Sequence, residues 1–300
     1  MKREDNMYDV IIIGAGPAGI SASLYTKRAG LKTLVLYSSK SNLEKAEKIE
    51  NYYGFEKGIN GKDLYNTGIK QAKKLEIEVE KEEVINILDN RFYGKKGFEV
   101  ITDKNEYQTK GVILATGNER KIPNIKGIKE FEGKGISYCA ICDGFFYRNK
   151  NVAVLGSGNY AIAETNELIN LAKHITILTN GEKAPEFRAE NVKVETRNIQ
   201  DITGNNKIEK VIFDDNTNLE IDGIFIAYGV AGSIDFARKL GAITKQNNIV
   251  VNEKMETNIK GLYACGDCTG GLLQISKAIY EGSTAGLQMI NYIKEINKED

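Results

Sequence analysis

An apolar run followed directly by a glycine-rich turn constrains the fold of this chain more than any other stretch. The apolar run covers residues 8–13, and the pattern Gly-x-Gly-x-x-Gly covers residues 14–19. Residues 17–29 are predicted to form a helix, and residues 33–37 a second apolar strand. Between a strand and a helix, three such glycines permit a tight turn, the close approach of a pyrophosphate and close helix–sheet packing. The stretch therefore predicts a parallel sheet with a dinucleotide at the N-terminus of its first helix.

The same pattern returns in the middle of the chain, which indicates a duplicated architecture. A predicted strand over residues 151–155 leads into Gly-Ser-Gly at residues 156–158, then a helix, then a further strand over residues 175–178. Later, the apolar run that ends at Gly229 mirrors the one that ends at Gly117. Two such units predict an α/β fold of two Rossmann-like domains, each a three-layer ββα arrangement of the FAD/NAD(P)-binding kind.

The C-terminal part of the chain is predicted to return to the first domain. A long helix is expected from about Leu273, and no third glycine-rich fingerprint precedes it. The residues after Gly117 are rich in Pro, Gly and Lys, as expected of a linker that crosses to the second domain. We therefore expect a discontinuous first domain of residues 1–117 with 234–300, and a second domain of residues 118–233.

Charge and hydropathy exclude several classes of function. The 41 Lys and Arg residues balance the 41 Asp and Glu residues, so no overall field attracts nucleic acid or an acidic membrane surface. No apolar stretch approaches the roughly 20 residues that a membrane span requires. Unlike a signal peptide, the basic N-terminus is interrupted by Glu4 and Asp5 before the first predicted strand. These features predict a soluble cytoplasmic protein without nucleic acid or membrane partners.

The four cysteines fall into two Cys-x-x-Cys pairs, Cys139 with Cys142 and Cys265 with Cys268. Such a pair in a cytoplasmic protein is more often redox-active than structural, and Asp143 adds a carboxyl group that can exchange a proton. The pairs lie too far apart for a zinc ribbon, and the chain has a single histidine, so no metal site is expected. Packing as buried apolar residues is the alternative for either pair, and for Cys265 and Cys268 it is favoured over a second redox pair.

Several motifs together resemble the low-molecular-weight thioredoxin reductases, flavoproteins of the two-domain disulfide reductase group. The motifs are the glycine-rich turn at residues 14–19, Ile49-Glu50-Asn51, Ala115-Thr116-Gly117, the stretch from Cys139 to Gly144, and Gly266-Asp267 with Gln274. In this order they cover nearly the whole chain. The resemblance implies FAD as cofactor, thioredoxin as protein substrate and a homodimer.

The resemblance also implies which residues bind FAD and which exchange the disulfide. The implied FAD-binding residues are Gly14, Ala15, Gly16, Pro17, Ala18, Asn42, Asn51, Val84, Ala115, Thr116, Gly117, Gly266, Asp267, Gln274 and Ile275. Among them, Asp267 is expected at the ribityl–phosphate part and Gln274 near the isoalloxazine ring. Cys142 is implied to face the flavin, Cys139 to attack thioredoxin, and Asp143 to act as the acid–base group.

The second glycine-rich turn departs from the family pattern, and this departure concerns the electron donor. NADPH-dependent members carry His-Arg-Arg after the second strand of this unit, whereas this chain has Thr179-Asn180-Gly181. A 2′-phosphate needs Arg or Lys for charge-assisted hydrogen bonds. Tyr160 replaces a small residue at the helix N-terminus and is expected to obstruct a pyrophosphate. NADPH is therefore disfavoured as a cofactor.

Three hypotheses about activity follow. The favoured one is a ferredoxin-dependent flavin thioredoxin reductase, in which ferredoxin supplies single electrons and the dithiol passes them in pairs to thioredoxin. The second is an NAD(P)H-dependent thioredoxin reductase, in which Glu182 would hold the ribose of NADH. The third is a flavin redox sensor that signals through its dithiol to a bound partner without catalysis.

Overall fold

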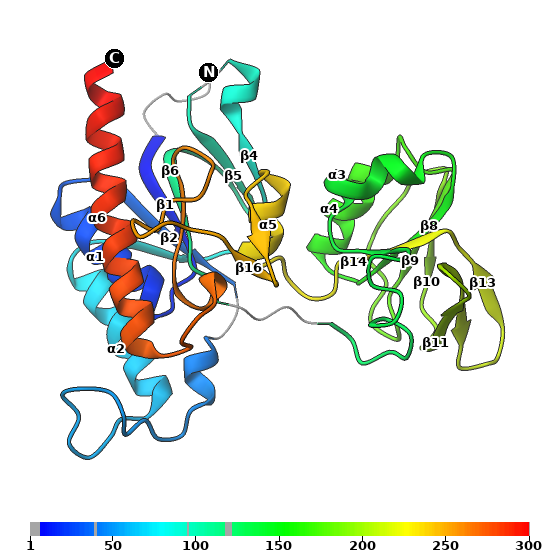
Figure 1. Cartoon of the computed structure of the whole chain (residues 1–300), viewed down its shortest axis with the longest axis horizontal. Coiled ribbons are helices and arrows are strands. Elements are labelled where there is room, and N and C mark those ends of the chain that lie inside the picture. The colour runs from blue at the N-terminus through cyan, green and yellow to red at the C-terminus, as the bar shows by residue number, and fades with distance from the viewer. Residues whose placement is uncertain (1–6, 39–40, 95, 118–121, 300) are drawn as a thin grey trace. The chain divides into compact units, whose positions relative to one another are not determined.

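The structure, a computed structural model, describes residues 7–38, 41–94, 96–117 and 122–299 (Figure 1). The chain folds into two compact units, one made of Met1–Glu119 with Gly232–Asp300 and the other of Arg120–Ala231. The predicted α/β class is confirmed, since the main sheet of each unit contains a Rossmann-like set of neighbouring parallel strands. The expected boundary after residue 117 adjoins residues 118–121, which lie outside the described residues.

The sheet of the first unit is mixed, and strand β1 lies near its middle. Its order is β3-β2-β1-β6-β5-β4, with β17 also paired to β6. The strands are β1 (Met7–Ile13), β2 (Thr33–Tyr37), β3 (Glu78–Lys81), β4 (Val84–Asp89), β5 (Phe98–Thr102), β6 (Glu106–Leu114) and β17 (Leu262–Ala264). Ile12 of β1 pairs in parallel with Val35 of β2 and with Ile113 of β6. All three side chains are fully buried, which explains the near-continuous apolar runs that predict these strands.

Strand β6 pairs with three other strands, and this pairing brings the C-terminal segment to the first glycine-rich turn. The first half of β6 pairs antiparallel with β5. Its second half pairs in parallel with β1 on one side and, over residues 112–114, with β17 on the other. The parallel strands β1, β6 and β17 therefore end at the same edge of the sheet, where Gly14, Ala115 and Cys265 follow them.

Two long helices of the first unit pack against each other through glycines. These two helices are α1 (Pro17–Arg28) and α6 (Ile275–Glu299). The unit also contains the helices α2 (Gly61–Lys74) and α5 (Ser233–Lys239), 3-10 helices at Asn42–Lys45, Asn90–Tyr93 and Gly266–Thr269, and the short strands β15 (Thr244–Lys245) and β16 (Asn248–Ile249). A Cβ atom added at Gly282 would lie 2.1 Å from the carbonyl oxygen of Ala18, and one at Gly286 would lie 2.7 Å from that of Ala22. The C-terminal helix thus packs against α1 of the first unit (Figure 1). Within the described part of the chain, no helix combines the length and the apolar character needed to cross a membrane.

The second unit has a parallel sheet of order β10-β9-β8-β14-β7 and an antiparallel sheet of order β11-β12-β13. The strands are β7 (Ile136–Ser137), β8 (Asn151–Leu155), β9 (His174–Leu178), β10 (Val192–Glu195), β11 (Ile199–Gly204), β12 (Ile208–Phe213), β13 (Asn218–Glu220) and β14 (Gly223–Ile226). Its helices are α3 (Ala140–Asp143) and α4 (Asn159–Leu168), with a 3-10 helix at Gly144–Tyr147. Leu155, Phe213 and Ile224 lie in one buried core, so side chains from both sheets contribute to it.

Candidate active site

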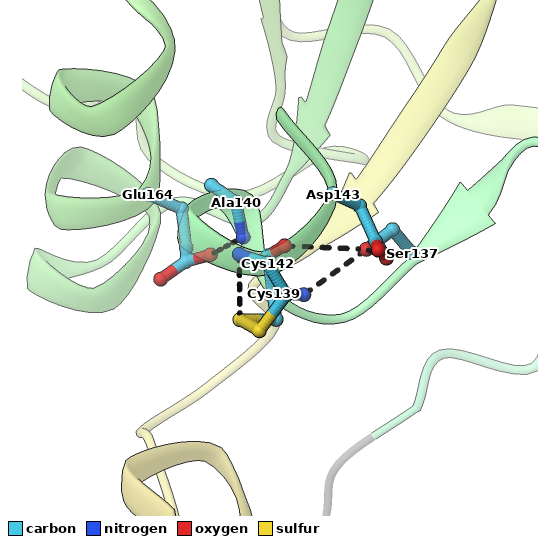
Figure 2. The surroundings of a disulfide bond; sticks show 6 residues. All are labelled: Ser137, Cys139, Ala140, Cys142, Asp143 and Glu164. Carbon is cyan, nitrogen blue, oxygen red and sulfur yellow. Dashed lines mark hydrogen bonds between the residues drawn. A yellow bond between two sulfur atoms is a disulfide. The ribbon is translucent and has the colours of Figure 1, made fainter. Parts of the chain in front are cut away.

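The central feature of the candidate site is a disulfide on the first turn of α3. Cys139 and Cys142 are bonded through their sulfurs, and their Cα atoms lie 5.3 Å apart. Cys139 is the N-cap residue of α3, and its sulfur accepts a hydrogen bond from the backbone N–H of Cys142 at 3.2 Å (Figure 2). Residues three apart in a helical turn are neighbours on its surface, so the two sulfurs stay within reach of each other when the bond opens.

The two sulfur-bearing residues differ in their access to solvent. Only 3% of Cys139 is exposed, whereas Cys142 is an exposed residue. Exchange with another protein requires that the partner can reach the attacking sulfur. Cys142 is therefore the more accessible residue of the pair, whereas the resemblance implies Cys139 as the thiol that attacks thioredoxin.

Ser137 links the backbone of Cys139 to the carboxylate of Asp143. Its hydroxyl donates to Oδ2 of Asp143 at 2.6 Å and accepts from the N–H of Cys139 at 3.1 Å (Figure 2). Asp143, the expected acid–base residue, is thereby held beside the dithiol in a half-buried position. The sequence prediction assigned no role to Ser137. A serine two residues before a cysteine that begins a helix is the local signal that could have indicated it.

A buried carboxylate fixes the start of α3. Glu164 of α4 is 1% exposed, and its Oε2 accepts a hydrogen bond from the N–H of Ala140 at 2.7 Å (Figure 2). That N–H is among the groups that a helix leaves without an intrahelical partner at its N-terminus. The carboxylate therefore ties α4 to the dithiol turn. The sequence prediction missed Glu164. The feature that could have indicated its role is an acidic residue on the same helix face as the buried Ala161 and Leu168.

Large apolar side chains lie exposed next to the disulfide turn. Ile141 is 46% exposed, Phe145 67% and Phe146 69%. The rings of Phe145 and Phe146 meet edge to face, with centroids 6.4 Å apart. Exposed clusters of aromatic and aliphatic side chains are typical of surfaces that bind other proteins. The exposed sulfur-bearing residue Cys142 therefore lies in a setting suited to a protein partner, a feature that the sequence prediction did not identify.

The first glycine-rich turn has the shape that a pyrophosphate requires. Gly14 adopts φ +116°, and a Cβ atom there would lie 2.3 Å from the carbonyl oxygen of Ala115. A Cβ atom at Gly19 would lie 1.9 Å from the carbonyl oxygen of Gly14, so the helix packs directly on the turn. Gly16, the N-cap of α1, faces open space, since its nearest neighbour would be the Ser41 hydroxyl at 3.8 Å. The turn is thus closed by backbone on two sides. It is open on the side where a phosphate can accept hydrogen bonds from the N–H groups at the helix N-terminus.

Predicted FAD-binding residues from distant parts of the chain converge in the first unit. A Cβ atom at Gly266 would lie 2.9 Å from the Cβ of Ala18, which brings the segment of Asp267 against the first turn of α1. The amide nitrogen of Asn51 donates to Oε1 of Gln274 at 3.1 Å, although 223 residues separate them. The donor set fits FAD, since the turn suits its pyrophosphate and these polar side chains suit its hydroxyls and ring nitrogens.

The remaining predicted residues of this group have different surroundings. The backbone N–H of Thr116 donates to the hydroxyl of Ser233 at 3.0 Å, and the Thr116 hydroxyl accepts from the N–H of Ser233 at 2.7 Å. Asn42 begins the 3-10 helix after β2, Val84 is a buried residue at the start of β4, and Ile275 begins α6. Strand β4 is the edge of the sheet farthest from β2 in the strand order. The roles of Asn42 and Val84 therefore rest on the resemblance alone.

An ion pair supports the turn that carries Asp267. Glu281 is 8% exposed, and its Oε2 accepts hydrogen bonds from the N–H of Gly266 at 2.8 Å and the hydroxyl of Thr269 at 2.9 Å. The ammonium of Lys277 lies 3.0 Å from the same oxygen. Burial raises the pKa of Asp267, an increase that Lys277 opposes and Glu281 reinforces. The sequence prediction missed this ion pair. The four-residue spacing of Lys277 and Glu281 on one helix is the feature that could have indicated it.

The second cysteine pair lies in the core. Cys265 and Cys268 are free thiols, and both are fully buried. The thiol of Cys268 donates to the carbonyl oxygen of Cys265 at 3.3 Å. Burial raises the pKa of both thiols, that of Cys268 to about 12, so both stay protonated at neutral pH. Because the thiolate is the reactive form, the structure supports packing over a second redox pair.

The second glycine-rich turn keeps the backbone shape of the first. A Cβ atom at Gly156 would lie 2.1 Å from the carbonyl oxygen of Ala227, and Gly158 is the N-cap of α4. The expectation that Tyr160 obstructs this turn is corrected by its burial. Tyr160 is 3% exposed and belongs to the buried face of α4, together with Leu168.

Comparison with known proteins places these features in a family. The family described as pyridine nucleotide-disulphide oxidoreductase matches residues 8–282. The thioredoxin reductase of Bacillus subtilis (strain 168) is 34% identical over 98% of this chain and 98% of its own length. The crystal structure of the atypical thioredoxin reductase TRi from Desulfovibrio vulgaris Hildenborough has a TM-score of 0.86 at 38% identity, covering 96% of this chain and 98% of that one. A ferredoxin-flavin thioredoxin reductase from Clostridium acetobutylicum has a TM-score of 0.67 at 32% identity, covering 96% of this chain and 99% of that one. The chain therefore belongs to the pyridine nucleotide-disulphide oxidoreductase family.

Proposed function

We propose that this protein is a flavin-dependent thioredoxin reductase that receives its electrons from reduced ferredoxin. The observation that carries the proposal is the Cys139–Cys142 disulfide, whose second residue is exposed beside uncovered phenylalanines. The similarity to the thioredoxin reductase of Bacillus subtilis, which extends over 98% of this chain, supports thioredoxin as the protein whose disulfide is reduced.

FAD is the cofactor whose shape and polarity the first unit fits, and when bound it supplies the two electrons that open the disulfide. The turn of Gly14, Gly16 and Ala18 would hold its pyrophosphate, because the N-terminus of α1 is open there. Asp267 would accept hydrogen bonds from its hydroxyls. Gln274, held by Asn51, would lie at the ring.

The dithiol would reduce the partner in two exchanges. The Cys142 thiolate attacks one sulfur of the partner's disulfide, and the other partner sulfur leaves with the electron pair and takes up a proton. Cys139 then displaces the partner's sulfur from Cys142, which restores the intramolecular disulfide and releases the partner with two thiols. Asp143, oriented by Ser137 at 2.6 Å, is the group on hand to accept and return these protons.

Two observations support a donor other than NADPH. The loop after β9 uses its polar groups for packing, since Oδ1 of Asn180 accepts the N–H of Ile199 at 2.8 Å and Gly181 lies against the side chain of Asn198. Thr179, Asn180 and Gly181 are uncharged residues, so they offer no cation to a 2′-phosphate. The similarity to a ferredoxin-flavin thioredoxin reductase over 96% of this chain favours ferredoxin as the donor.

A nicotinamide donor is the second candidate. The description of the family to which the chain belongs names a pyridine nucleotide. The backbone of the second glycine-rich turn is also retained, with Gly156 tight against Ala227. In this case the missing cations favour NADH over NADPH.

The donor is tested by anaerobic mixing of the oxidised, FAD-loaded protein with reduced ferredoxin, NADPH or NADH while flavin absorbance is followed. We expect rapid bleaching by reduced ferredoxin only, and recovery of the absorbance on addition of oxidised thioredoxin. Rapid bleaching by NADPH would overturn the ferredoxin assignment and leave the dithiol chemistry intact. Failure of thioredoxin to restore the absorbance would count against the substrate.

Two further expectations rest on the resemblance and the composition. We expect the FAD-loaded protein to be a homodimer, which sedimentation equilibrium measures. We also expect a cytoplasmic location, which cell fractionation measures. A monomer at concentrations well above those of the assay would contradict the first expectation.

A further inference from the structure

The second unit presents the edge of its sheet at which Rossmann-like folds bind their ligands. Strands β9, β8 and β14 are neighbours in the parallel sheet, and their carboxyl ends meet at one edge. In open α/β sheets, ligands bind in the crevice outside these ends. The segments that begin there are the loop from Thr179, the turn from Gly156 and the stretch from Ala227. The proposed function leaves this crevice without a ligand.

One side chain joins all three segments. Glu182 lies in the loop after β9, and its Oε2 accepts a hydrogen bond from the hydroxyl of Ser157, the middle residue of the Gly-Ser-Gly turn. Its Oε1 accepts a hydrogen bond from the hydroxyl of Tyr228, two residues beyond β14, at 2.7 Å. This bond raises the pKa of Tyr228, and burial adds to the increase. The carboxylate of Glu182 therefore spans the crevice from the phosphate turn to the end of β14.

The backbone of the loop holds Glu182 in this position. The N–H of Glu182 donates to the carbonyl oxygen of Thr179 at 3.2 Å, and its own carbonyl oxygen accepts from the Thr179 hydroxyl at 2.8 Å. Between them, Asn180 and Gly181 both adopt positive φ, at 50° and 80°. Thr179 is fully buried, which anchors the turn. Although Glu182 is exposed to solvent, its direction is therefore set by a closed turn.

The negative charge of the Glu182 carboxylate would repel a phosphate group bound in this crevice. Gly158, directly after Ser157, is the N-cap of α4, and a helix N-terminus stabilises a nearby negative charge. A dinucleotide would have to break the hydrogen bonds of Glu182 or place its pyrophosphate beside a like charge. The glycine before the helix is open in both units, since a Cβ atom would lie 3.8 Å from the nearest atom at Gly16 and 3.7 Å at Gly158. The two turns differ in the residue between their glycines, which is Ala15 in the first unit and Ser157, the partner of Glu182, in the second.

We propose that Glu182 determines donor specificity by closing the dinucleotide crevice of the second unit, so that this unit binds neither NADPH nor NADH. The consequence of this inference, that electrons come from a donor that does not bind in this crevice, rests on the proposed function. The closing itself is argued from the hydrogen bonds of Glu182 with Ser157 and Tyr228, independently of the electron donor.

The test is a gain of binding in FAD-loaded, oxidised, full-length protein. Calorimetric titration with NADH and with NADPH compares the wild type with Glu182→Gln, which removes the charge, and Glu182→Ala, which opens the crevice. Glu186→Gln is the matched control, because it removes the same charge from an exposed position in the same loop. We expect no saturable binding by the wild type or the control up to the highest nucleotide concentration used, and saturable binding by both Glu182 variants with a Kd at least about tenfold below that concentration. Thermal unfolding of each variant confirms that it is folded.

The other outcomes separate this inference from the donor assignment. If the Glu182 variants bind no more tightly than the control, the inference is overturned, and the ferredoxin experiment is unaffected. If the wild type binds NADH and Glu182→Ala loses that binding, Glu182 is a ribose ligand and the inference is overturned, while flavin bleaching still decides the electron donor. If the wild type binds NADPH and the Glu182 variants bind it equally well, the inference is also overturned, and the ferredoxin assignment is still decided by flavin bleaching.

Discussion

The two cysteines of the disulfide differ in solvent exposure, and in the reduced protein the more exposed thiol should react faster. Cys139 is 3% exposed and is fixed as the N-cap of α3, whereas Cys142 is exposed. In the reduced protein we expect iodoacetamide to alkylate Cys142 at least about tenfold faster than Cys139. Mass spectrometry of the reduced Cys139→Ser and Cys142→Ser variants measures the two rates separately, and a double variant gives the background from the buried pair.

The same variants test the exchange with the partner. Reduced Cys139→Ser should form a mixed disulfide with oxidised thioredoxin and accumulate it, since no second thiol resolves it. Reduced Cys142→Ser should form little mixed disulfide, because its remaining thiol is buried. Equal alkylation rates, or a mixed disulfide carried only by Cys139, would contradict the assignment of Cys142 as the attacking residue.

The buried thiol of Cys268 should make stability depend on alkaline pH. Burial raises the pKa of Cys268 to about 12, whereas an unfolded cysteine loses its proton near pH 8.5. The folded pKa is the higher one, so the stabilisation is complete below about pH 8.5 and is lost as pH rises toward the folded pKa. The loss should approach about 1.4 kcal/mol of unfolding free energy per pH unit for this thiol.

Urea unfolding of the reduced wild type and of Cys268→Ala between about pH 9 and pH 11 measures this loss. Tyrosines and lysines titrate in both proteins, so the difference between the two slopes isolates the thiol. The wild type should lose stability more steeply than the variant. Parallel slopes would show that the thiol is not protected from solvent in the folded state.

Among the elements, the contact between α1 and α6 depends on a glycine. A Cβ atom at Gly282 would lie 2.1 Å from the carbonyl oxygen of Ala18, which belongs to the first turn of α1. Gly282→Ala should push the helices apart, destabilise the protein by about 1–3 kcal/mol and speed the release of FAD. Urea unfolding and flavin fluorescence measure the two effects.

Gly68→Ala in α2 is the matched control for this substitution. Its added Cβ atom would approach only Cγ2 of Ile20, at 3.7 Å, which is an ordinary contact. Alanine is favoured over glycine within a helix by about 1 kcal/mol, so this variant should be neutral or stabilised. If Gly282→Ala behaved like Gly68→Ala, the close packing of α1 on α6 would be contradicted.

Elements whose geometry is local were predictable, and contacts between distant segments were not. The turn at residues 14–19 requires only its own glycines and the strand before it, so its pattern indicated both the fold and the ligand class. Glu164 was missed because its partner, the N–H of Ala140, lies 24 residues earlier and on another element. The exposure of Cys142 and the burial of Cys139 depend on how the cap of α3 is formed, which the spacing of the two residues does not determine.

Across the whole molecule, the two units share one architecture and differ at their glycine-rich turns. Both turns are open at the glycine before the helix, Gly16 or Gly158, but in the second turn Ser157 is hydrogen-bonded to the carboxylate of Glu182, which also contacts Tyr228. Under the proposed function, one copy of the fold binds the cofactor and the other carries the dithiol. The duplicated pattern in the sequence correctly indicated two Rossmann-like units, but it did not indicate that one side chain bridges the second turn.

The connectivity of the two units predicts that only one of them folds by itself. The second unit, Arg120–Ala231, is a continuous segment with its own core around Leu155, Phe213 and Ile224. The first unit is interrupted, and its N-terminal segment alone would lack both β17 and α6. A continuous segment of roughly 100–150 residues with a separate core is a common domain size.

We therefore expect isolated Arg120–Ala231 to unfold cooperatively in urea and to keep its disulfide, and we expect isolated Met1–Glu119 not to fold. Circular dichroism measures the transitions, and thiol titration before and after dithiothreitol counts the sulfurs of Cys139 and Cys142. The isolated second unit should also bind no FAD, because the turn that fits its pyrophosphate belongs to the first unit. A gradual, non-cooperative transition in the isolated second unit would show that its core depends on the rest of the chain, and the two units would then have to be treated as a single folding unit.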